Sequence, residues 1–173
     1  PLGRGAGPLT AAALVQVHGD EAASAFLAGV ARARPQLAAS DAEVQALVAR
    51  GSAALGLAGS EQGAAGAVSA AALEVVFPDQ GGSGALVFPT AVALLAAGRS
   101  SEAARGLARW MASADAEQLL VARAPGYMPL RPGVPLPHGV RSAAEVRAPL
   151  LDWEALVPIA RSFEQRLAGW PTP

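Results

Sequence analysis

Between residues 10 and 95, segments with the apolar spacing of an amphipathic helix alternate with short segments that are apolar on both faces. A strand that is apolar on both faces is typical of a mostly parallel sheet covered by helices on each side. The alternation therefore predicts an α/β fold. Helices are expected at residues 10–17, 20–34 and 41–50, and strands at 53–57, 73–77, 86–88 and 92–95.

The rest of the chain carries helical patterns separated by a proline-rich stretch. Helices are expected at residues 101–112, 115–123 and 153–167. In the first of these, Leu107, Trp110 and Met111 should point inward. Residues 125–140 lack periodicity and should cross a surface as extended chain. Asp152 is placed to cap the last helix. The apolar stripe of that helix consists of Trp153, Leu156, Val157, Ala160, Phe163 and Leu167.

The composition excludes several chemistries. The chain has 173 residues, a length that suits one domain, or one lobe plus part of another. It has no cysteine and no lysine, so it offers no thiol nucleophile, disulfide, thiolate metal site, Schiff base or phosphate-loop lysine. The net charge is −1 and the arginines do not cluster, which argues against nucleic-acid binding. The longest apolar run, residues 85–97, is too short to span a bilayer.

Three loops are candidates for a ligand site. Ligands of parallel sheets bind beyond the carboxyl ends of the strands, near helix N-termini. Loops 1–10, 38–42 and 58–63 each precede an expected helix and should line one cleft. The candidate ligand contacts are Gly5, Ala6, Ser40, Asp41, Ser60 and Glu61. A plainer explanation stays open for each loop: a flexible start, a helix N-cap and a solvated helix start, respectively.

No catalytic or metal-ligating set is expected. His18 and His138 lie far apart in the sequence, and neither has a second ligand nearby. Ser83 lies among glycines but lacks the Gly-x-Ser-x-Gly elbow and an obvious histidine partner. Tyr127, the only tyrosine, is expected to pack beside the proline-rich stretch. We therefore expect no enzymatic activity, no cofactor and no resident metal.

Several short strings occur in a recognisable order. They are Val48–Gly51, Ala54–Leu57, Val75–Gln80, Gly84–Leu94, Ser101–Arg105, Pro129–Val134 and Asp152–Trp153. Their succession resembles the carboxyl-terminal half of ABC-transporter solute-binding proteins of the ferric-iron-binding family. The likeness covers nearly the whole chain from about residue 10.

The resemblance implies a type II periplasmic-binding-protein fold, in which two α/β lobes close on a ligand. By analogy, residues 1–78 would belong to lobe two, residues 79–124 would return toward lobe one, and residues 125–173 would be a tail that packs back on lobe two. In that family the signal peptide and most of lobe one lie in the amino-terminal half, so by analogy this chain would be a processed or truncated piece. Such proteins bind a metal, anion or small polar solute in the periplasm and deliver it to an inner-membrane permease.

The chain departs from the family where ferric binders place paired tyrosines, just after the strand equivalent to residues 53–57. Residues 58–62 contain no tyrosine and a single carboxylate, so direct ferric binding is not expected. Two alternatives remain open. One is a small-molecule-sensing effector domain of a transcription regulator with the same fold, and the other is a degenerate copy that binds nothing.

The resemblance also implies unpaired strand edges. If residues 86–95 belong to a sheet whose other strands are absent, they should pair with a second copy of the chain or rearrange. A homodimer of the isolated piece is therefore a possible partner arrangement.

Overall fold

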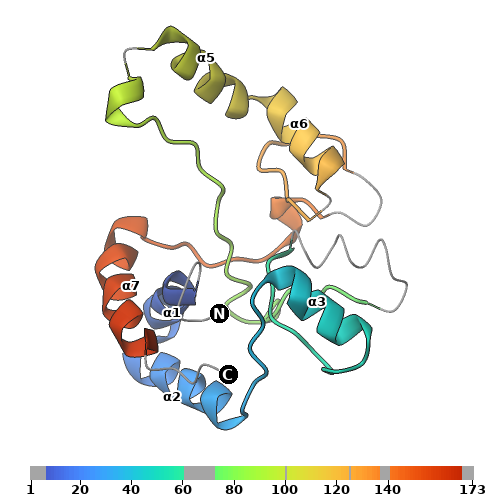
Figure 1. Ribbon diagram of the computed structural model, residues 1–173, viewed down its shortest axis with the longest axis vertical. Coiled ribbons are helices and arrows are strands. Elements are labelled where there is room, and N and C mark those ends of the chain that lie inside the picture. The colour runs from blue at the N-terminus through green and yellow to red at the C-terminus, as the bar shows by residue number, and fades with distance from the viewer. Residues whose placement is uncertain (1–6, 61–72, 100, 125, 137–140, 169–173) are drawn as a thin grey trace.

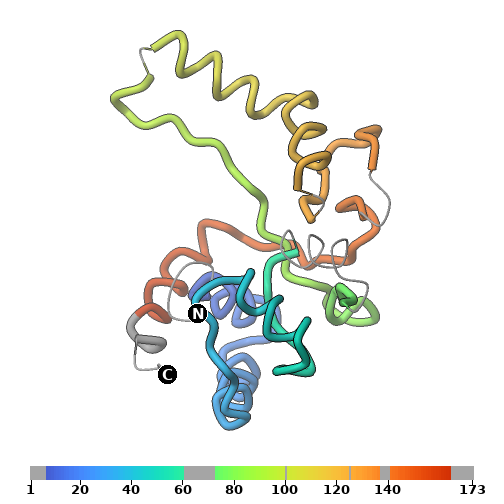
Figure 2. Tube along the Cα trace, turned by 45° about the vertical axis from the view of Figure 1, so that its right-hand side comes forward, coloured from blue at the N-terminus to red at the C-terminus, as the bar shows by residue number. Residues whose placement is uncertain are grey.

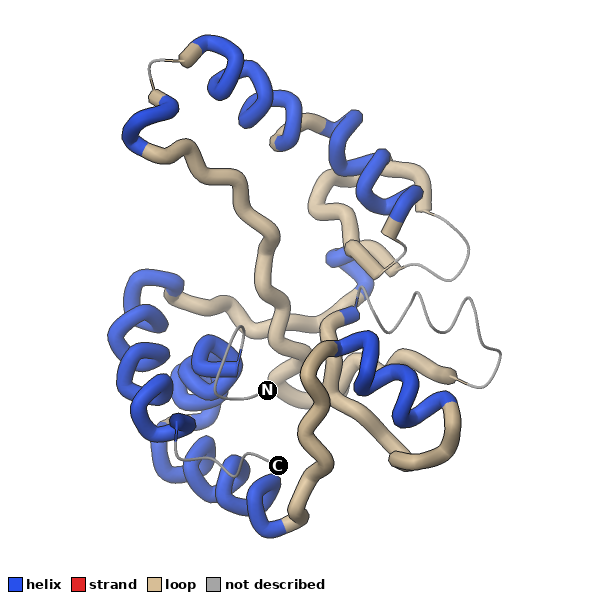
Figure 3. The backbone as a smooth tube through the Cα atoms, in the orientation of Figure 1, coloured by secondary structure: helices blue, strands red, loops and turns tan. Residues whose placement is uncertain are grey.

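The computed structural model describes residues 7–60, 73–99, 101–124, 126–136 and 141–168. In these ranges about half of the residues are helical and none forms a strand (Figure 3). The expected α/β fold of the type II periplasmic-binding-protein kind is therefore wrong. The helices are α1 Gly7–His18, α2 Asp20–Arg32, α3 Asp41–Ala49, η1 Ala96–Gly98, α5 Glu102–Met111, α6 Ala114–Arg123, η2 Ala143–Glu145 and α7 Trp153–Ala168 (Figure 1).

The segments expected as strands, residues 53–57, 73–77, 86–88 and 92–95, form no strand within the described ranges. Residues 54–58 and 86–94 make no backbone hydrogen bond within the described part of the molecule. A strand exists only through hydrogen bonds to a neighbouring strand. The apolar pattern predicts that such a segment avoids helix, but it does not supply the partner, and this is why the sheet prediction failed.

Helices α1, α2 and α7 form the main packed unit. Helix α1 packs against both α2 and α7 (Figure 1). One core cluster joins Ala11, Leu27 and Phe163, and a second joins Ala12 and Ala13 to Leu156 and Ala160. The alanines of α1 are fully buried, so the small side chains let α7 approach the α1 backbone closely.

Helix starts follow the capping residues of the sequence. The hydroxyl of Ser40 accepts a hydrogen bond from the backbone N–H of Glu43, and Ser101 and Ser113 act in the same way on α5 and α6. Helix α2 has Gly19 as its N-cap and Asp20 as its first helical residue, whereas the sequence also allowed Asp20 itself as the cap. Gly19 has φ +84°, a backbone conformation that glycine adopts without strain.

Helices α5 and α6 pack on each other, away from the α1, α2 and α7 unit (Figures 1 and 2). Helix α5 has no buried residue. Leu107, Trp110 and Met111 are exposed rather than directed inward, so that expectation is wrong. Helical spacing places these side chains on one face but does not determine what covers that face.

A connecting segment, Leu86–Leu95, runs from the α1–α7 unit toward η1 and α5 (Figure 3). At its start, Leu86 and Phe88 pack against the second core cluster. The ring of Phe88 meets the ring of Trp153 edge to face, with centroids 6.0 Å apart. The connecting segment is thus fixed to the packed unit at one end only.

Two glutamine side chains hold the segment between η2 and α7. The Gln80 amide donates to the Arg147 carbonyl oxygen at 3.0 Å and accepts from the Arg147 N–H at 2.8 Å. Gln16 does the same with Asp152, at 3.2 and 2.8 Å. Each glutamine amide therefore pairs with a main-chain N–H and C=O, as a neighbouring strand would. No helix in the described ranges has the length and apolar character needed to cross a membrane.

Candidate functional site

Three segments that are distant in sequence meet at two hydrogen bonds. The backbone N–H of Gly59 donates to Asp41 Oδ2 at 3.1 Å. The hydroxyl of Ser60 donates to the Gly126 carbonyl oxygen at 2.9 Å. Asp41, Gly59 and Ser60 are half-buried and Gly126 is buried. We call the group of Ser40, Asp41, Gly59, Ser60 and Gly126 the loop junction.

The N-terminus of α3 positions the first part of the loop junction. Ser40 Oγ accepts from Glu43 N–H at 3.2 Å, and the Glu43 carboxylate accepts from Ala39 N–H at 2.7 Å. These bonds stabilise the start of the helix at Asp41. The Asp41 carboxylate is left to receive the loop that follows α3.

The loop that carries Gly59 and Ser60 returns over the side of α3. A Cβ atom on Gly56 would lie 3.1 Å from Val48 Cγ2 and closer still to the Val44 side chain. Glycine at this position therefore allows the loop to lie directly on the helix. The close approach brings Gly59 and Ser60 back to the level of Asp41.

The charges around the loop junction are negative. Asp41 and Glu43 occupy the first turn of α3, where carboxylates are stabilised by the partial positive charge of the helix N-terminus. The same two carboxylates already balance that partial charge. An anionic ligand would meet net repulsion here, whereas a neutral polar or cationic ligand would not.

The carbonyl of Gly126 belongs to a segment that a second polar cluster holds to α6. Glu117 accepts hydrogen bonds from the N–H groups of Leu130 and Arg131, at 2.5 and 3.3 Å, and forms an ion pair with the Arg131 guanidinium at 3.0 Å. The guanidinium also donates to the Ala112 carbonyl oxygen. We call Glu117, Leu130, Arg131 and Ala112 the Glu117 cluster.

The Glu117 cluster lowers the pKa of Glu117 below its ordinary value of 4.5. Burial alone would raise this pKa. The hydrogen bonds from Leu130 and Arg131 and the charge of the guanidinium stabilise the carboxylate and outweigh the effect of burial. The Glu117 cluster therefore holds residues 130 and 131 against α6, and this contact depends on an ionised Glu117 carboxylate.

Three of the candidate ligand contacts lie in the loop junction, namely Ser40, Asp41 and Ser60. Gly5, Ala6 and Glu61 lie outside the described residues. Sequence reasoning missed Gly126, because residues 125–140 were expected only to cross a surface. The Pro-Gly dipeptide at 125–126 is the signal that could have marked a turn there.

The side chains of the loop junction are suited to hydrogen bonding. In the described ranges, no group of three or more His, Asp or Glu side chains is arranged to hold a metal ion. The junction offers hydroxyl, carboxylate and main-chain groups from loops, which are the usual carriers of binding sites. This set can recognise a solute that donates hydrogen bonds or carries positive charge.

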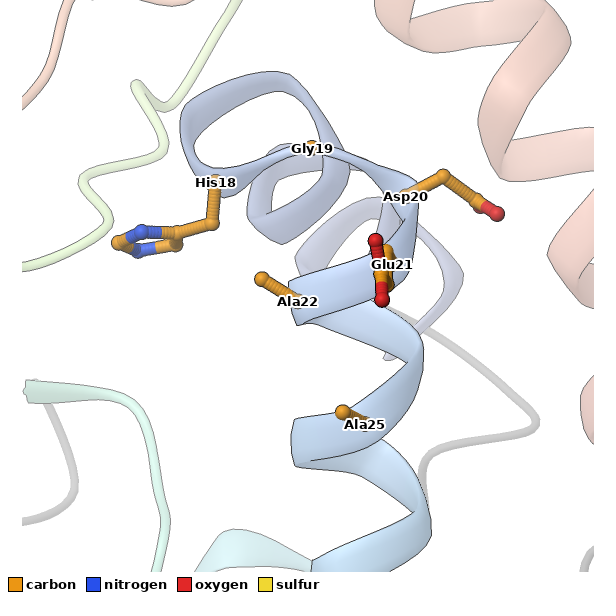
Figure 4. A pocket seen from close by; sticks show the side chains of 6 residues that line it. All are labelled: His18, Gly19, Asp20, Glu21, Ala22 and Ala25. Carbon is orange, nitrogen blue, oxygen red and sulfur yellow. The ribbon is translucent and has the colours of Figure 1, made fainter.

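A hollow, separate from the loop junction, lies at the corner between α1 and α2. Its lining residues are His18, Gly19, Asp20, Glu21, Ala22 and Ala25 (Figure 4). The side chains of His18, Asp20 and Glu21 point away from one another in this view. Because they do not converge on one point, this hollow is a weaker candidate than the loop junction.

Comparison of the chain with protein-family models, with curated proteins and with solved structures finds no match. The resemblance to solute-binding proteins of ABC importers therefore stays a prediction from the sequence.

Proposed function

We propose that this chain works as part of the solute-binding component of a bacterial ABC importer and takes a small polar solute at the loop junction. Two observations support this proposal. The strings of the resemblance occur in order along nearly the whole chain. The loops on either side of α3, which were expected to line one cleft, meet through the bond between Gly59 and Asp41.

The single observation that carries the proposal is the convergence of three loops at half-buried polar groups. The Asp41 carboxylate and the Ser60 hydroxyl come from different loops, and each is already placed by one hydrogen bond. Side chains that are fixed before binding lose little conformational entropy when a ligand arrives. The negative charge of Asp41 and Glu43 favours a neutral polar or cationic solute over an anion.

Binding at the loop junction would restrain the chain between α3 and α6. A solute that bridges Asp41 and Ser60 reinforces the contact to Gly126, and through it the position of the segment that leaves α6. Such a ligand shifts the population toward states in which the three loops are joined. Its binding therefore also stabilises the fold, by an amount set by ligand concentration and affinity.

The test is a solute panel measured by thermal shift and calorimetry. The panel holds neutral sugars and polyols, amino acids, polyamines, phosphate, sulfate, citrate and ferric citrate. We expect stabilisation by at least one neutral or cationic compound and none by the inorganic anions. Asp41→Asn and Ser60→Ala should each weaken that binding by about tenfold or more, as expected for loss of a charged or hydroxyl contact.

Two matched variants control for general effects. Asp115→Asn removes the same charge from the first turn of α6, and Ser83→Ala removes a half-buried hydroxyl that lies outside the loop junction. Both should bind like the wild type. Binding by anions alone, or equal affinities for the junction and control variants, would contradict the proposal.

The proposal includes a location and a partner. The protein would act in the periplasm and would deliver its solute to an inner-membrane permease. We expect the loaded protein to co-purify with the permease encoded beside its gene, and the Ser60→Ala variant to do so less in the presence of solute. Co-purification that does not depend on solute would argue for a different role.

A further inference from the structure

Over most of the connecting segment Leu86–Leu95, the main-chain groups have no hydrogen-bond partner among the described residues. Its neighbours are fixed: Ala85 N–H donates to the Arg147 carbonyl oxygen at 2.9 Å, and the Leu95 carbonyl oxygen accepts from Gly98 N–H at 2.9 Å. Between them, residues 86–94 make no backbone hydrogen bond to any described residue. A run of extended chain with unpaired N–H and C=O groups is a template for another strand.

The side chains of the connecting segment favour such pairing. Val92 is 41% exposed and Leu95 is 80% exposed. Residues 80–98 contain no charged side chain, so nothing repels a second uncharged strand. An apolar stretch with β-branched residues and no charge has the composition of self-pairing segments. Pro89 has no N–H and sets one end of the pairing region.

We propose that Thr90–Leu94 pairs antiparallel with the same residues of a second copy of this chain. A two-fold axis beside Val92 would place each Val92 opposite its counterpart and each Thr90 opposite Leu94 of the other copy. This arrangement is isologous, so one uncharged surface serves both partners and the assembly closes as a dimer. It is independent of the proposed solute binding.

The molecule has surface available for this association. Its accessible surface area is 11,444 Å². A compact folded monomer of 17.3 kDa exposes about 7,800 Å². The excess of about 3,600 Å² is spread over the whole molecule, and the exposed residues 89–95 of the connecting segment contribute to it.

The absence of cysteine from the chain permits a direct test of the register. Val92→Cys introduces one thiol per chain, and directly opposite residues of an antiparallel pair have Cα atoms about 4.5–5.5 Å apart, within the range of a disulfide. Under mild oxidation this variant should form covalent dimers at least about tenfold faster than Leu150→Cys. Leu150 is 101% exposed, so the control thiol is more accessible.

Charge exchange at Val92 provides the second test. The wild type should sediment as a concentration-dependent dimer. Val92→Lys alone and Val92→Glu alone should dimerise at least about tenfold more weakly, because like charges would face each other across the axis. An equimolar mixture of the two variants should regain dimerisation, and Leu150→Lys should retain it.

Four results would overturn the proposal. They are a wild type that stays monomeric at its highest soluble concentration, equal cross-linking at positions 92 and 150, dimers that persist in both charged variants, and a mixture that does not recover. If the connecting segment paired instead with residues 54–58 of its own chain, the wild type would stay monomeric and its amides would be protected. That outcome would also overturn the proposal. Circular dichroism on each variant verifies that the helices are intact.

Discussion

The Glu117 carboxylate accepts hydrogen bonds from two backbone N–H groups and forms an ion pair with Arg131. Glu117→Gln should lower the free energy of unfolding by about 1 kcal/mol, since the ion pair with half-exposed Arg131 is weak but two backbone N–H groups also lose a charged acceptor. Asp115→Asn, on the same helix, is the control and should change stability by less than about 0.5 kcal/mol. Urea unfolding followed by circular dichroism measures both.

The stabilisation by Glu117 depends on pH in a defined direction. Its pKa is lower in the folded protein than the ordinary value of 4.5. A lowered folded-state pKa adds stability above the pKa of the unfolded chain, and this stability disappears as the pH falls through the folded-state pKa. The difference between wild type and Glu117→Gln should therefore be constant near neutral pH and shrink below about pH 4.5. A difference that grows on acidification would refute this role.

Gly84 lies at a position where a side chain has no room. Its φ is +91°, and a Cβ atom would lie 2.6 Å from the Arg147 carbonyl carbon. Gly84→Ala should cost about 2 kcal/mol or more, from backbone strain and from displacement of the bond between Ala85 and Arg147. Gly81→Ala in the same turn has an open position and no positive φ, so it should be nearly neutral. Thermal unfolding of the two variants gives the comparison.

Single residues were predictable from the sequence where the interaction is local. Ser40 caps the helix that follows it, because a serine side chain reaches the N–H group three residues later in any helix start. The bond from Ser60 to Gly126 spans 66 residues, and no local pattern encodes it. The ion pair between Glu117 and Arg131 is likewise not encoded by any local pattern, because only the fold brings the two residues together.

Helix α7 is the element whose packing the sequence describes best. Leu156, Ala160 and Phe163 of the expected apolar stripe are buried, and Leu156, at 0% exposed, lies against the alanines of α1. The stripe was wrong for Trp153 and Val157, which are 43% and 47% exposed. Leu156→Ala should cost about 2–5 kcal/mol, through lost burial and the cavity left behind. Val157→Ala should cost less than about 1 kcal/mol. Equal losses in urea unfolding would mean that α7 does not present this face to α1.

Helix α5 should be the least protected of the long helices. It has no buried residue, whereas α1 buries Ala11, Ala12 and Ala13. Opening of a helix with few buried contacts needs little free energy. Amide hydrogen exchange should therefore be faster in residues 102–111 than in the buried part of α1, and α7 should resemble α1. Equal protection in α5 and α1 would indicate that a partner covers the exposed face.

The described α-helices lie close to where the sequence predicts them, because spacing and capping residues act within a few positions, whereas the short helices η1 and η2 were not predicted. Their ends are less well predicted: α1 begins at Gly7 rather than at Thr10, and Pro8 fits in the first turn, where its missing N–H costs nothing. The predictions of strands, in contrast, were wrong. Residues 53–57 and 86–88 have the apolar pattern of strands, but a strand needs a partner from elsewhere.

The whole molecule exposes more surface than a compact chain of its mass. Unfolding would therefore release about a fifth less surface than expected for a compact 17.3 kDa domain. Because the urea m-value scales with that surface, the m-value of the complete transition should be about a fifth lower than the norm for this length. A normal m-value in dilute solution would show that the free chain is more compact.

The loop junction also depends on how the whole chain is arranged, because its residues come from loops that are distant in sequence. The sequence predicted that loops 38–42 and 58–63 should lie together, on the assumption of a parallel sheet. The sheet is absent from the described ranges, yet Asp41 and Gly59 are in contact. The contact arises because the loop after α3 returns over that helix, which the pattern of residues 51–58 did not reveal.

The glutamine pairs at Gln16 and Gln80 have an evolutionary consequence. Both bind main-chain atoms of residues 147 and 152, so these contacts do not depend on the side chains at those two positions. Leu151, which packs against the second core cluster, and Asp152, whose carboxylate accepts from the N–H groups of Glu154 and Ala155, remain constrained by their side chains. Substitutions at the exposed positions 147, 148 and 150 can therefore accumulate without moving α7, provided that no proline removes the amide of 147, and distant descendants of this chain should keep the two glutamines.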